Sequence, residues 1–281
     1  MGYKFVLIGY PIDHSLSPWI HKQFLEKSKI QGSYSIYEIE PDDSFQDKIA
    51  ALKDNEINGF NVTAPYKQRI IPFLDEIDRS AEVIGAVNTV VNQDGKWIGY
   101  NTDGMGYLRS LKSKYPSFYT DKSSRILIIG AGGAARGVYY GLVSEGFKYI
   151  DITNRTVENA TEIAKLKAED TNTSILPFHE VAKYLDNYDL IVQTTSVGMK
   201  PSSDRSVFSM DTIKAGCIVS DIIYQPIETK FLKEAQRTGA LVHFGHTMLL
   251  YQAQYAFEIW TGKKVPLESM DHQLKLILEG R

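Results

Sequence analysis

The stretch of residues 125–138 constrains the fold more than any other part of the sequence. It opens with the uninterrupted apolar run Ile126-Leu-Ile-Ile129, which is typical of a parallel strand buried on both faces. The run stops at Gly130, and two of the next three residues are also glycine, so the backbone can turn tightly and approach a phosphate without an intervening Cβ atom. A helix is predicted to begin near Ala134, and its first N–H groups would point toward that anion. The stretch therefore predicts a strand, turn and helix that bind a nucleotide phosphate in an α/β protein.

The spacing of the small residues in this turn narrows the kind of nucleotide. Gly130-x-Gly132-x-x-Ala135 fits the G-x-G-x-x-G/A dinucleotide fingerprint, although glycine-rich turns of this type also occur without cofactors. The next predicted strand, residues 148–153, is followed by Asn154-Arg155-Thr156, where an NAD enzyme would carry an acid for the ribose 2′-hydroxyl. A guanidinium at this position can bind a 2′-phosphate in fork geometry. Arg155 therefore favours NADP, the alternative being a solvated loop arginine.

Length and charge limit the remaining possibilities. With 281 residues, the chain exceeds the usual size of one domain and predicts two. The hydrophobic fraction of 43% and charged fraction of 23% are those of a soluble globular protein, and the net charge of -3 gives no general attraction to nucleic acid or to an anionic membrane. Because we find neither an apolar run near the ~18 residues of a spanning helix nor a signal-peptide pattern at the N-terminus, we expect a cytoplasmic protein with small-molecule partners.

The cysteine and histidine content predicts neither a disulfide nor a metal site. The single cysteine, Cys217, lies in an apolar stretch, so we expect it to be buried and inert. His243 and His246 have a spacing that a metal could use, but no third ligand is apparent near them in the sequence. We therefore predict structural roles for both histidines.

Hydroxyl side chains follow the first predicted strand, Phe5–Gly9. Ser17 precedes Pro18, which suits the first position of a helix, so the local pattern favours Ser17 as the N-cap of that helix. Ser15 has no such structural explanation. It lies at the carboxyl end of a strand, where α/β sheets bind ligands, and short hydroxyls there would suit a polyhydroxylated or carboxylated substrate.

A lysine follows a later strand of the first hundred residues. The strand Gly59–Thr63 ends at Ala64-Pro65, and Lys67 is predicted to lie in the first turn of a short helix. An ammonium group there opposes the helix dipole at a cost of roughly 0.3 to 1 kcal/mol, which indicates a functional role without proving one. The alternative is a solvated surface lysine.

An aspartate marks the end of the predicted first domain. The segments 87–92 and 96–100 form a predicted hairpin around Asp94-Gly95. Asn101-Thr-Asp103-Gly104 follows, which usually indicates a turn closed by Asn or Asp side chains. Asp103 also lies where the first domain gives way to a predicted helix at residues 105–111, a position expected to line a cleft.

Two further segments with candidate binding residues lie in the second half of the chain. Met199 ends a loop after the predicted strand 189–193, where a nicotinamide ring would be expected, although an ordinary loop hydrophobe is the alternative. Thr247 is predicted to cap a helix to Trp260, on which Met248 and Gln252 share one side. Gln252 would be an unpaired buried amide unless a partner, such as a substrate hydroxyl, bonds it.

These motifs together closely resemble the shikimate dehydrogenase family, from about Gly9 to the C-terminus. The matching segments are Pro11-Ile-Asp-His-Ser-Leu-Ser-Pro18, Asn61-Val-Thr-Ala-Pro-Tyr-Lys67, Ala86-Val-Asn-Thr89, Asn101-Thr-Asp-Gly104, Gly130-Ala-Gly-Gly133, Asn154-Arg-Thr156, Thr194-Thr-Ser-Val-Gly-Met199, Tyr224-Gln-Pro226 and Gly245-His-Thr-Met-Leu-Leu-Tyr-Gln252. The resemblance implies that Lys67 and Asp103 are the catalytic pair. It implies a substrate site made of Ser15, Ser17, Thr63, Asn88, Tyr224 and Gln252. It implies a cofactor site made of Gly130, Ala131, Gly132, Gly133, Ala134, Asn154, Arg155, Thr156, Met199 and Gly245.

The resemblance also implies a fold and an activity. We expect an α/β protein with an N-terminal substrate domain built on a mostly parallel sheet, residues 1–103 and 247–281, and a Rossmann-type doubly wound NADP domain, residues 104–246. The implied reaction is the reversible NADPH-dependent reduction of 3-dehydroshikimate to shikimate, in the biosynthesis of aromatic amino acids. No metal is implied, and we expect a monomer or homodimer.

One departure and three alternatives qualify this resemblance. Many members of the family carry an acid near the cofactor where this chain has Arg79, and we assign neither Arg79 nor the adjacent Asp78 to the site. The alternatives are a quinate/shikimate dehydrogenase of broader specificity, a lysine-using dehydrogenase of the tetrahydrofolate type, and a non-catalytic NADP-binding regulator. The serine pair at 15 and 17 together with Arg155 argues against the first two, and retention of both Lys67 and Asp103 argues against the third.

Overall fold

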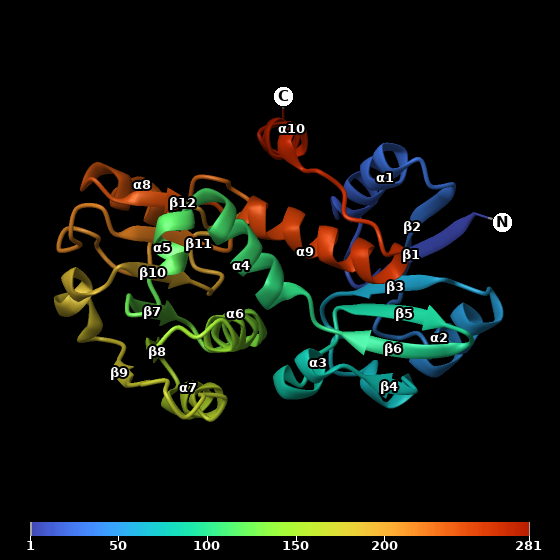
Figure 1. Ribbon diagram of the computed structural model, residues 1–281, viewed down its shortest axis with the longest axis horizontal. Coiled ribbons are helices and arrows are strands. Elements are labelled where there is room, and N and C mark those ends of the chain that lie inside the picture. The colour runs from blue at the N-terminus through green and yellow to red at the C-terminus, as the bar shows by residue number, and fades with distance from the viewer. Residues whose placement is uncertain (1, 281) are drawn as a thin grey trace. The chain divides into compact units, whose positions relative to one another are not determined.

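A computed structural model describes residues 2–280 of the chain. The chain forms two compact units, each built around a six-stranded sheet (Figure 1). Unit 1 holds the residues up to Asp103 together with Gln252–Pro266, and unit 2 holds Gly104–Tyr251 and the residues from Leu267 onward. The expected α/β fold is confirmed. Within the described residues, no helix is both long enough and apolar enough to cross a membrane.

The sheet of unit 1 is mixed, with the strand order β2-β1-β3-β5-β6-β4. Strand β1 pairs in parallel with β2 and β3, as does β4 with β6, while β5 is antiparallel to β3 and β6. The strands are β1 (Tyr3–Gly9), β2 (Gly32–Glu38), β3 (Gly59–Val62), β4 (Glu76–Ile77), β5 (Thr89–Gln93) and β6 (Lys96–Tyr100). The helices are α1 (Ser17–Ser28), α2 (Phe45–Asp54), the short 3-10 helix η1 (Ile71–Phe73) and α3 (Arg79–Ile84).

Side chains that alternate along β1 divide the core of unit 1 into two layers. Val6 and Ile8 are buried in a cluster with α2. Phe5 points to the opposite face, where its ring stacks on Trp260 with centroids 4.5 Å apart. The Nε1–H group of Trp260 also donates to the carbonyl oxygen of Val90 at 2.8 Å. A side chain from near the C-terminus therefore completes the N-terminal core.

The sheet of unit 2 is parallel throughout, with the order β12-β11-β10-β7-β8-β9. Its strands are β7 (Arg125–Ile129), β8 (Tyr149–Asn154), β9 (Ile175–Pro177), β10 (Leu190–Gln193), β11 (Ile218–Asp221) and β12 (Leu241–His243). The other elements are α4 (Asp103–Lys114), α5 (Pro116–Thr120), α6 (Gly133–Ser144), α7 (Val157–Ala164), the 3-10 helix η2 (Val181–Asn187), α8 (Lys230–Arg237), α9 (Gly245–Thr261) and α10 (Glu268–Leu278). Helix α9 contributes residues to both units.

Strand β7 is buried on both faces, as its sequence predicts. Ile126 and Ile128 pack with α4, α6 and α7, whereas Leu127 and Ile129 pack with η2 and α8. Helices therefore cover both faces of the sheet, which makes unit 2 a doubly wound, Rossmann-like domain. Such a sheet binds ligands beyond the carboxyl ends of its strands, and the glycine turn lies at the end of β7.

Two local predictions about helix boundaries are wrong. Thr247 lies inside α9, where its hydroxyl donates to the carbonyl of Phe244 at 2.7 Å. Lys67 lies in a turn ahead of η1. The helix α9 begins two residues ahead of Thr247, and a turn replaces the helix predicted at Lys67.

Candidate active site

The serine loop follows the carboxyl end of β1. Helix α1 begins at Ser17 itself, with Leu16 in the capping position, so the prediction that Ser17 is the N-cap is wrong. The N–H group of Ser17, at the start of the helix, instead donates to the Oγ atom of Ser15 at 3.2 Å. Ser17 is buried, and its side chain lies beside the Tyr34 hydroxyl, whose pKa is raised by burial and lowered to a smaller extent by Ser17. The structure thus brings the two predicted substrate-binding serines into direct contact.

The turn that carries Lys67 is held by backbone bonds to its neighbours. The carbonyl of Lys67 accepts from the N–H of Val87 at 2.8 Å, which anchors the lysine beside the start of β5. Thr63, four residues earlier, donates its N–H to the carbonyl of Ile8 at 2.9 Å and is half-buried. Because Lys67 lies in a turn, the helix dipole on which its sequence argument depended does not act there.

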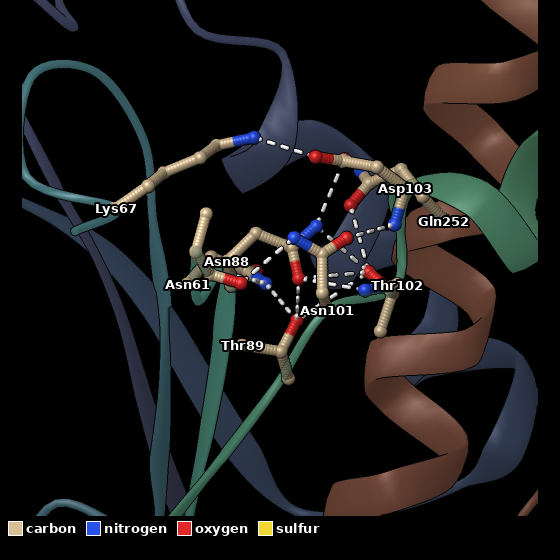
Figure 2. Close-up of polar contacts among 9 residues, drawn as sticks. Asn61, Lys67, Asn88, Thr89, Asn101, Thr102, Asp103 and Gln252 are labelled. Carbon is tan, nitrogen blue, oxygen red and sulfur yellow. Dashed lines mark hydrogen bonds and ion pairs between the residues drawn. The ribbon is translucent and has the colours of Figure 1, made fainter. Parts of the chain in front are cut away.

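Lys67 and Asp103 form the central ion pair of unit 1. The Lys67 Nζ atom lies 2.6 Å from Asp103 Oδ2, and their side chains are 33% and 16% exposed. Figure 2 shows the ammonium group pointing at the carboxylate, which the Asn88 amide reaches as well. Asp103 is the first residue of α4, and its N–H donates to Asn101 Oδ1 at 3.1 Å, so the turn and the helix predicted at this position are both present.

Asn88 holds the other oxygen of the carboxylate. Its Nδ2 group donates to Asp103 Oδ1 at 2.9 Å and to Thr102 Oγ1 at 3.0 Å. Its Oδ1 atom accepts from the N–H of Thr102 at 2.9 Å and from Thr89 Oγ1 at 3.0 Å. The carboxylate of Asp103 therefore receives a donor at each oxygen, one charged and one neutral.

Two buried threonines belong to this constellation although the sequence did not single them out. Thr89 and Thr102 are fully buried and bond to Asn88, and Thr102 Oγ1 also donates to Gln252 Oε1 at 3.4 Å. Gln252, on the α9 segment of unit 1, thus has a partner within the protein (Figure 2). The signal that could have found the threonines is their place inside the Ala86–Thr89 and Asn101–Gly104 motifs.

The glycine turn of unit 2 has the geometry of a phosphate cradle. Gly130 has a φ of +112°, and a Cβ atom there would lie 2.6 Å from Thr194 Oγ1, so this position requires glycine. At Gly132 and Gly133, an added Cβ would meet nothing within 4 Å among residues 2–280, so their exposed backbone is open to a ligand. Helix α6 begins at Gly133. These residues fit a pyrophosphate at a helix N-terminus.

Arg155 lies beside this turn because β7 and β8 pair in parallel. Ile129 is in register with Thr153, and the N–H of Gly130 donates to the carbonyl of Thr153 at 2.8 Å. Asn154 ends β8 and its Nδ2 donates to the carbonyl of Thr156, which leaves Arg155 exposed at the carboxyl end of the strand. An exposed guanidinium here fits the 2′-phosphate of NADP.

The other predicted ligand residues of unit 2 follow β10 and β11 or begin α9. Met199 and Tyr224 are 46% and 37% exposed at the surface of unit 2. A Cβ atom at Gly245 would lie 2.3 Å from the carbonyl oxygen of Ile222, so close packing alone explains that glycine. Arg79, the residue at which the sequence departs from the expected family pattern, is exposed at the start of α3 in unit 1.

The carboxylate of Asp221 ties together the loops that carry Met199 and Tyr224. It accepts from the N–H of Ile223 at 2.9 Å, from Thr229 Oγ1 at 2.7 Å and from Gln193 Nε2 at 3.3 Å, while Gln193 Nε2 also donates to the carbonyl of Val197 at 3.2 Å. Burial raises the pKa of Asp221 to about 7 despite these three donors.

This pKa predicts a pH-dependent contribution to stability. The folded-state pKa lies above the ordinary value near 3.9, so the folded protein binds the proton more tightly, and stability falls as pH rises from about 4 to about 7. We expect wild type to lose a few kcal/mol relative to Asp221→Asn between pH 5 and pH 8, since each pKa unit is worth roughly 1.4 kcal/mol. Urea unfolding at both pH values measures this difference, with the exposed Asp186→Asn as control. An equal difference at both pH values would contradict the assignment.

The histidines and the cysteine have structural environments. His243 is buried between Ser110 Oγ at 3.0 Å and Ser220 Oγ at 2.8 Å, and burial lowers its pKa to about 3. His246 pairs with Asp271 at 2.9 Å. Cys217 is buried, which confirms that prediction and raises the pKa of its thiol to about 12. Among residues 2–280, no group of three or more His, Cys, Asp or Glu side chains could hold a metal ion.

Comparison with known proteins matches most of the chain to one family. The models for the shikimate dehydrogenase substrate binding domain, for shikimate / quinate 5-dehydrogenase and for the shikimate 5′-dehydrogenase C-terminal domain match residues 7–90, 112–217 and 245–275. The shikimate dehydrogenase (NADP(+)) of Oceanobacillus iheyensis is 52% identical over 275 residues, which are 98% of each chain.

Solved structures of similar proteins give the same result. A shikimate dehydrogenase in complex with NADP+ is 38% identical, with a TM-score of 0.88 over 97% of this chain and 94% of that one. The shikimate 5-dehydrogenase of Listeria monocytogenes, in complex with shikimate and NAD, is 33% identical, with a TM-score of 0.89 over 97% and 96%. The chain therefore belongs to the NADP-dependent shikimate dehydrogenase family and is an oxidoreductase of that family.

Proposed function

We propose that this chain catalyses the reversible NADPH-dependent reduction of 3-dehydroshikimate to shikimate, in the biosynthesis of aromatic amino acids, with Lys67 and Asp103 as its catalytic pair. The observation that carries the proposal is the 2.6 Å contact between Lys67 Nζ and Asp103 Oδ2, in a chain 52% identical to a shikimate dehydrogenase along nearly its whole length.

Lys67 is proposed as the general acid of the reduction. When bound, NADPH supplies the hydride that reduces the carbonyl carbon. The carbonyl oxygen then needs a proton, and Lys67 donates one from its ammonium group, which becomes a neutral amine. Because the Lys67 side chain is 33% exposed, the amine can recover its proton from water. In the oxidation direction the neutral amine takes the proton of the shikimate hydroxyl.

Asp103 is proposed to orient the lysine and the reacting hydroxyl. Its carboxylate holds the ammonium group through Oδ2 and is itself held by Asn88 through Oδ1. Such fixed geometry matters because a misplacement of ~1 Å can lower a rate ~100-fold. We further propose that Ser15 and Ser17 bind the substrate carboxylate through short donors, and that Thr63, Asn88, Tyr224 and Gln252 contribute to the rest of the substrate site.

The cofactor residues follow from the two loops at the carboxyl ends of β7 and β8. We propose that Gly130, Ala131, Gly132, Gly133 and Ala134 bind the pyrophosphate and that Asn154, Arg155 and Thr156 bind the 2′-phosphoryl ribose. Met199 and Gly245 are proposed to lie at the nicotinamide end. The functional division into a substrate domain, residues 1–103 and 247–281, and an NADP domain, residues 104–246, stays a prediction, as do a cytoplasmic location and a monomeric or homodimeric state.

Replacement of Arg155 is expected to weaken the binding of NADP but not that of NAD. We expect Arg155→Ala to weaken NADP binding about 10- to 100-fold, because charge-assisted hydrogen bonds to the 2′-phosphate are lost, and to leave NAD binding unchanged. Titration of the protein with each cofactor measures both affinities. Arg237→Ala, an exposed arginine at the end of α8 in the same unit, is the matched control. Equal weakening of both cofactors would show that Arg155 does not read the 2′-phosphate.

The assay that tests the function follows NADPH absorbance at 340 nm with shikimate or quinate, each supplied with NADP or NAD. We expect the highest kcat/KM for shikimate with NADP. Comparable values for quinate would instead support a quinate/shikimate dehydrogenase, and tight NADP binding without turnover would support a non-catalytic regulator.

A further inference from the structure

Asn88 uses all of its side-chain hydrogen-bonding capacity inside the protein. Its amide donates both protons, to Thr102 Oγ1 and Asp103 Oδ1, and its oxygen accepts from the N–H of Thr102 and from Thr89 Oγ1. An amide has two donors and two acceptor sites, so in this structure all four are occupied. Asn88 therefore holds the catalytic carboxylate in place, and the position of that carboxylate depends on the groups that hold Asn88. A direct contact of Asn88 with substrate would replace one of these four bonds.

Asn61 supports Asn88 from the neighbouring strand β3. Its Nδ2 group donates to the carbonyl oxygen of Asn88 and to Thr89 Oγ1, both at 3.1 Å. Its Oδ1 atom accepts from the hydroxyl of Tyr34 at 2.8 Å. Asn61 is 7% exposed and Thr89 is fully buried, so water does not replace these bonds when one is lost.

Tyr34 connects this support to the serine loop. Its hydroxyl lies beside the side chain of Ser17, the residue proposed to bind the substrate carboxylate, and this neighbour lowers the pKa of Tyr34 against the larger, opposite effect of burial. Its ring is held from one side by His21, which stacks on it at 4.3 Å with an interplanar angle of 6°. Burial lowers the pKa of His21 to about 3, so this neighbour stays neutral at any pH of interest.

The hydrogen bonds from Tyr34 to Asp103 form a chain in which each residue donates to the next. Tyr34 donates to Asn61, Asn61 to Thr89, and Thr89 to Asn88, and Asn88 then donates to Asp103. Each donor in such a chain is polarised by the one before it, and the chain ends on a carboxylate, where aligned donors are most effective. The chain of bonds links residues from β2, β3 and β5 to the start of α4.

We propose that Tyr34 is a positioning residue of the active site, whose hydroxyl sets the spacing between the serine loop and the catalytic carboxylate of Asp103. The proposal rests on the proposed function, because it takes Ser17 and Asp103 to act on opposite ends of one substrate. Tyr34 contacts α1, the helix that begins at Ser17, through the His21 ring, and it acts on Asp103 through Asn61, Thr89 and Asn88.

The test compares two tyrosines on the same strand. Tyr34→Phe removes the hydroxyl at the head of the chain, and Tyr37→Phe removes one that contacts only the carbonyl of Lys48, at 3.5 Å, among the described residues. We expect Tyr34→Phe to raise KM for shikimate and to lower kcat, each about three- to tenfold, the usual worth of one neutral hydrogen bond. We expect its KM for NADP to stay within about twofold of wild type, because the loops proposed to bind NADP belong to unit 2.

A comparison of kcat, KM for shikimate and KM for NADP with the melting temperature of Tyr34→Phe distinguishes a positioning role from a merely structural one. A structural hydroxyl would lower the melting temperature of Tyr34→Phe and leave kcat and KM of the folded enzyme at the values of Tyr37→Phe, which would overturn the proposal. A parallel rise in KM for NADP would overturn it as well, since that result indicates general damage. Wild type without activity toward shikimate and NADP would instead reject the proposed function.

A second variant keeps the proposal testable if Tyr34→Phe does not fold. Thr89→Val retains the shape of the side chain and removes the hydroxyl that links Asn61 to the side-chain oxygen of Asn88, while the bond from Asn61 to the Asn88 carbonyl remains. We expect kcat to fall about three- to tenfold with KM for shikimate nearly unchanged, because Ser17 and Tyr34 stay in place. Unchanged kcat in Thr89→Val would overturn the proposal.

Discussion

Replacing Lys67 by alanine is expected to lower kcat for shikimate oxidation by about 100- to 10,000-fold, the range that a positioned general acid or base contributes. The variant keeps the glycine turn and Arg155, so NADP affinity should match that of wild type. Steady-state assays in both directions measure kcat, and a cofactor titration measures the affinity. Normal turnover in Lys67→Ala would remove the lysine from the mechanism.

The matched control for this variant is Lys96→Ala. Lys96 also belongs to unit 1 and also pairs with a carboxylate, Glu76 Oε1 at 3.1 Å, but both side chains of that pair are more than half exposed. Loss of an exposed ion pair changes stability by about 0 to 1 kcal/mol. Wild-type kcat in Lys96→Ala would show that the loss in Lys67→Ala does not come from the change in net charge.

Replacing Asp103 by asparagine is expected to lower kcat about 100- to 1,000-fold, because an amide cannot satisfy both donors that face it. Lys67 Nζ and Asn88 Nδ2 each point at one oxygen of the carboxylate. In either orientation of the new amide, its own N–H group would face one of these donors, and the ammonium would lose its counter-charge. Kinetic assays at saturating shikimate measure the effect, and Asp43→Asn, which removes a carboxylate paired with Lys48 at 3.2 Å, is the control.

The double variant shows whether the two residues act as one unit. If Asp103 works by holding Lys67, then Asp103→Asn in the Lys67→Ala background should cost far less than in wild type. If the fold-loss of kcat in the double variant equals the product of the losses in the two single variants, the two side chains act independently. The proposed pair would then have to be abandoned.

Local sequence patterns were sufficient to predict β7, the glycine turn that follows it and the place of Arg155 at the end of β8. The run from Ile126 to Ile129 has no polar residue, which is typical of a strand covered on both faces, and the glycine at 130 ends it where φ becomes positive. Arg155 could be placed because a parallel strand pair brings consecutive strand ends together. These inferences need only neighbouring residues and the rule that α/β crossovers are regular.

The candidate site was predicted only in part, because its supporting contacts join distant segments. Lys67 and Asp103 were identified through motifs, yet the helix assigned to Lys67 is a turn whose backbone bonds to Val87. Tyr34 bonds to Asn61, 27 positions away, and Thr102 to Gln252, 150 positions away, and periodicity cannot reveal such pairs. The prediction that Ser17 is a cap failed because α1 already begins at Ser17, with Leu16 in the capping position.

The place of Trp260 in unit 1 has a consequence for synthesis on the ribosome. The chain grows from its N-terminus, so β1 to β6 emerge long before residue 260 does. Until then the Phe5 ring lacks the indole that covers it, and the carbonyl of Val90 lacks its donor. The first sheet to be made is thus among the last parts to be finished, and a nascent chain halted before residue 260 presents an uncovered aromatic surface to chaperones.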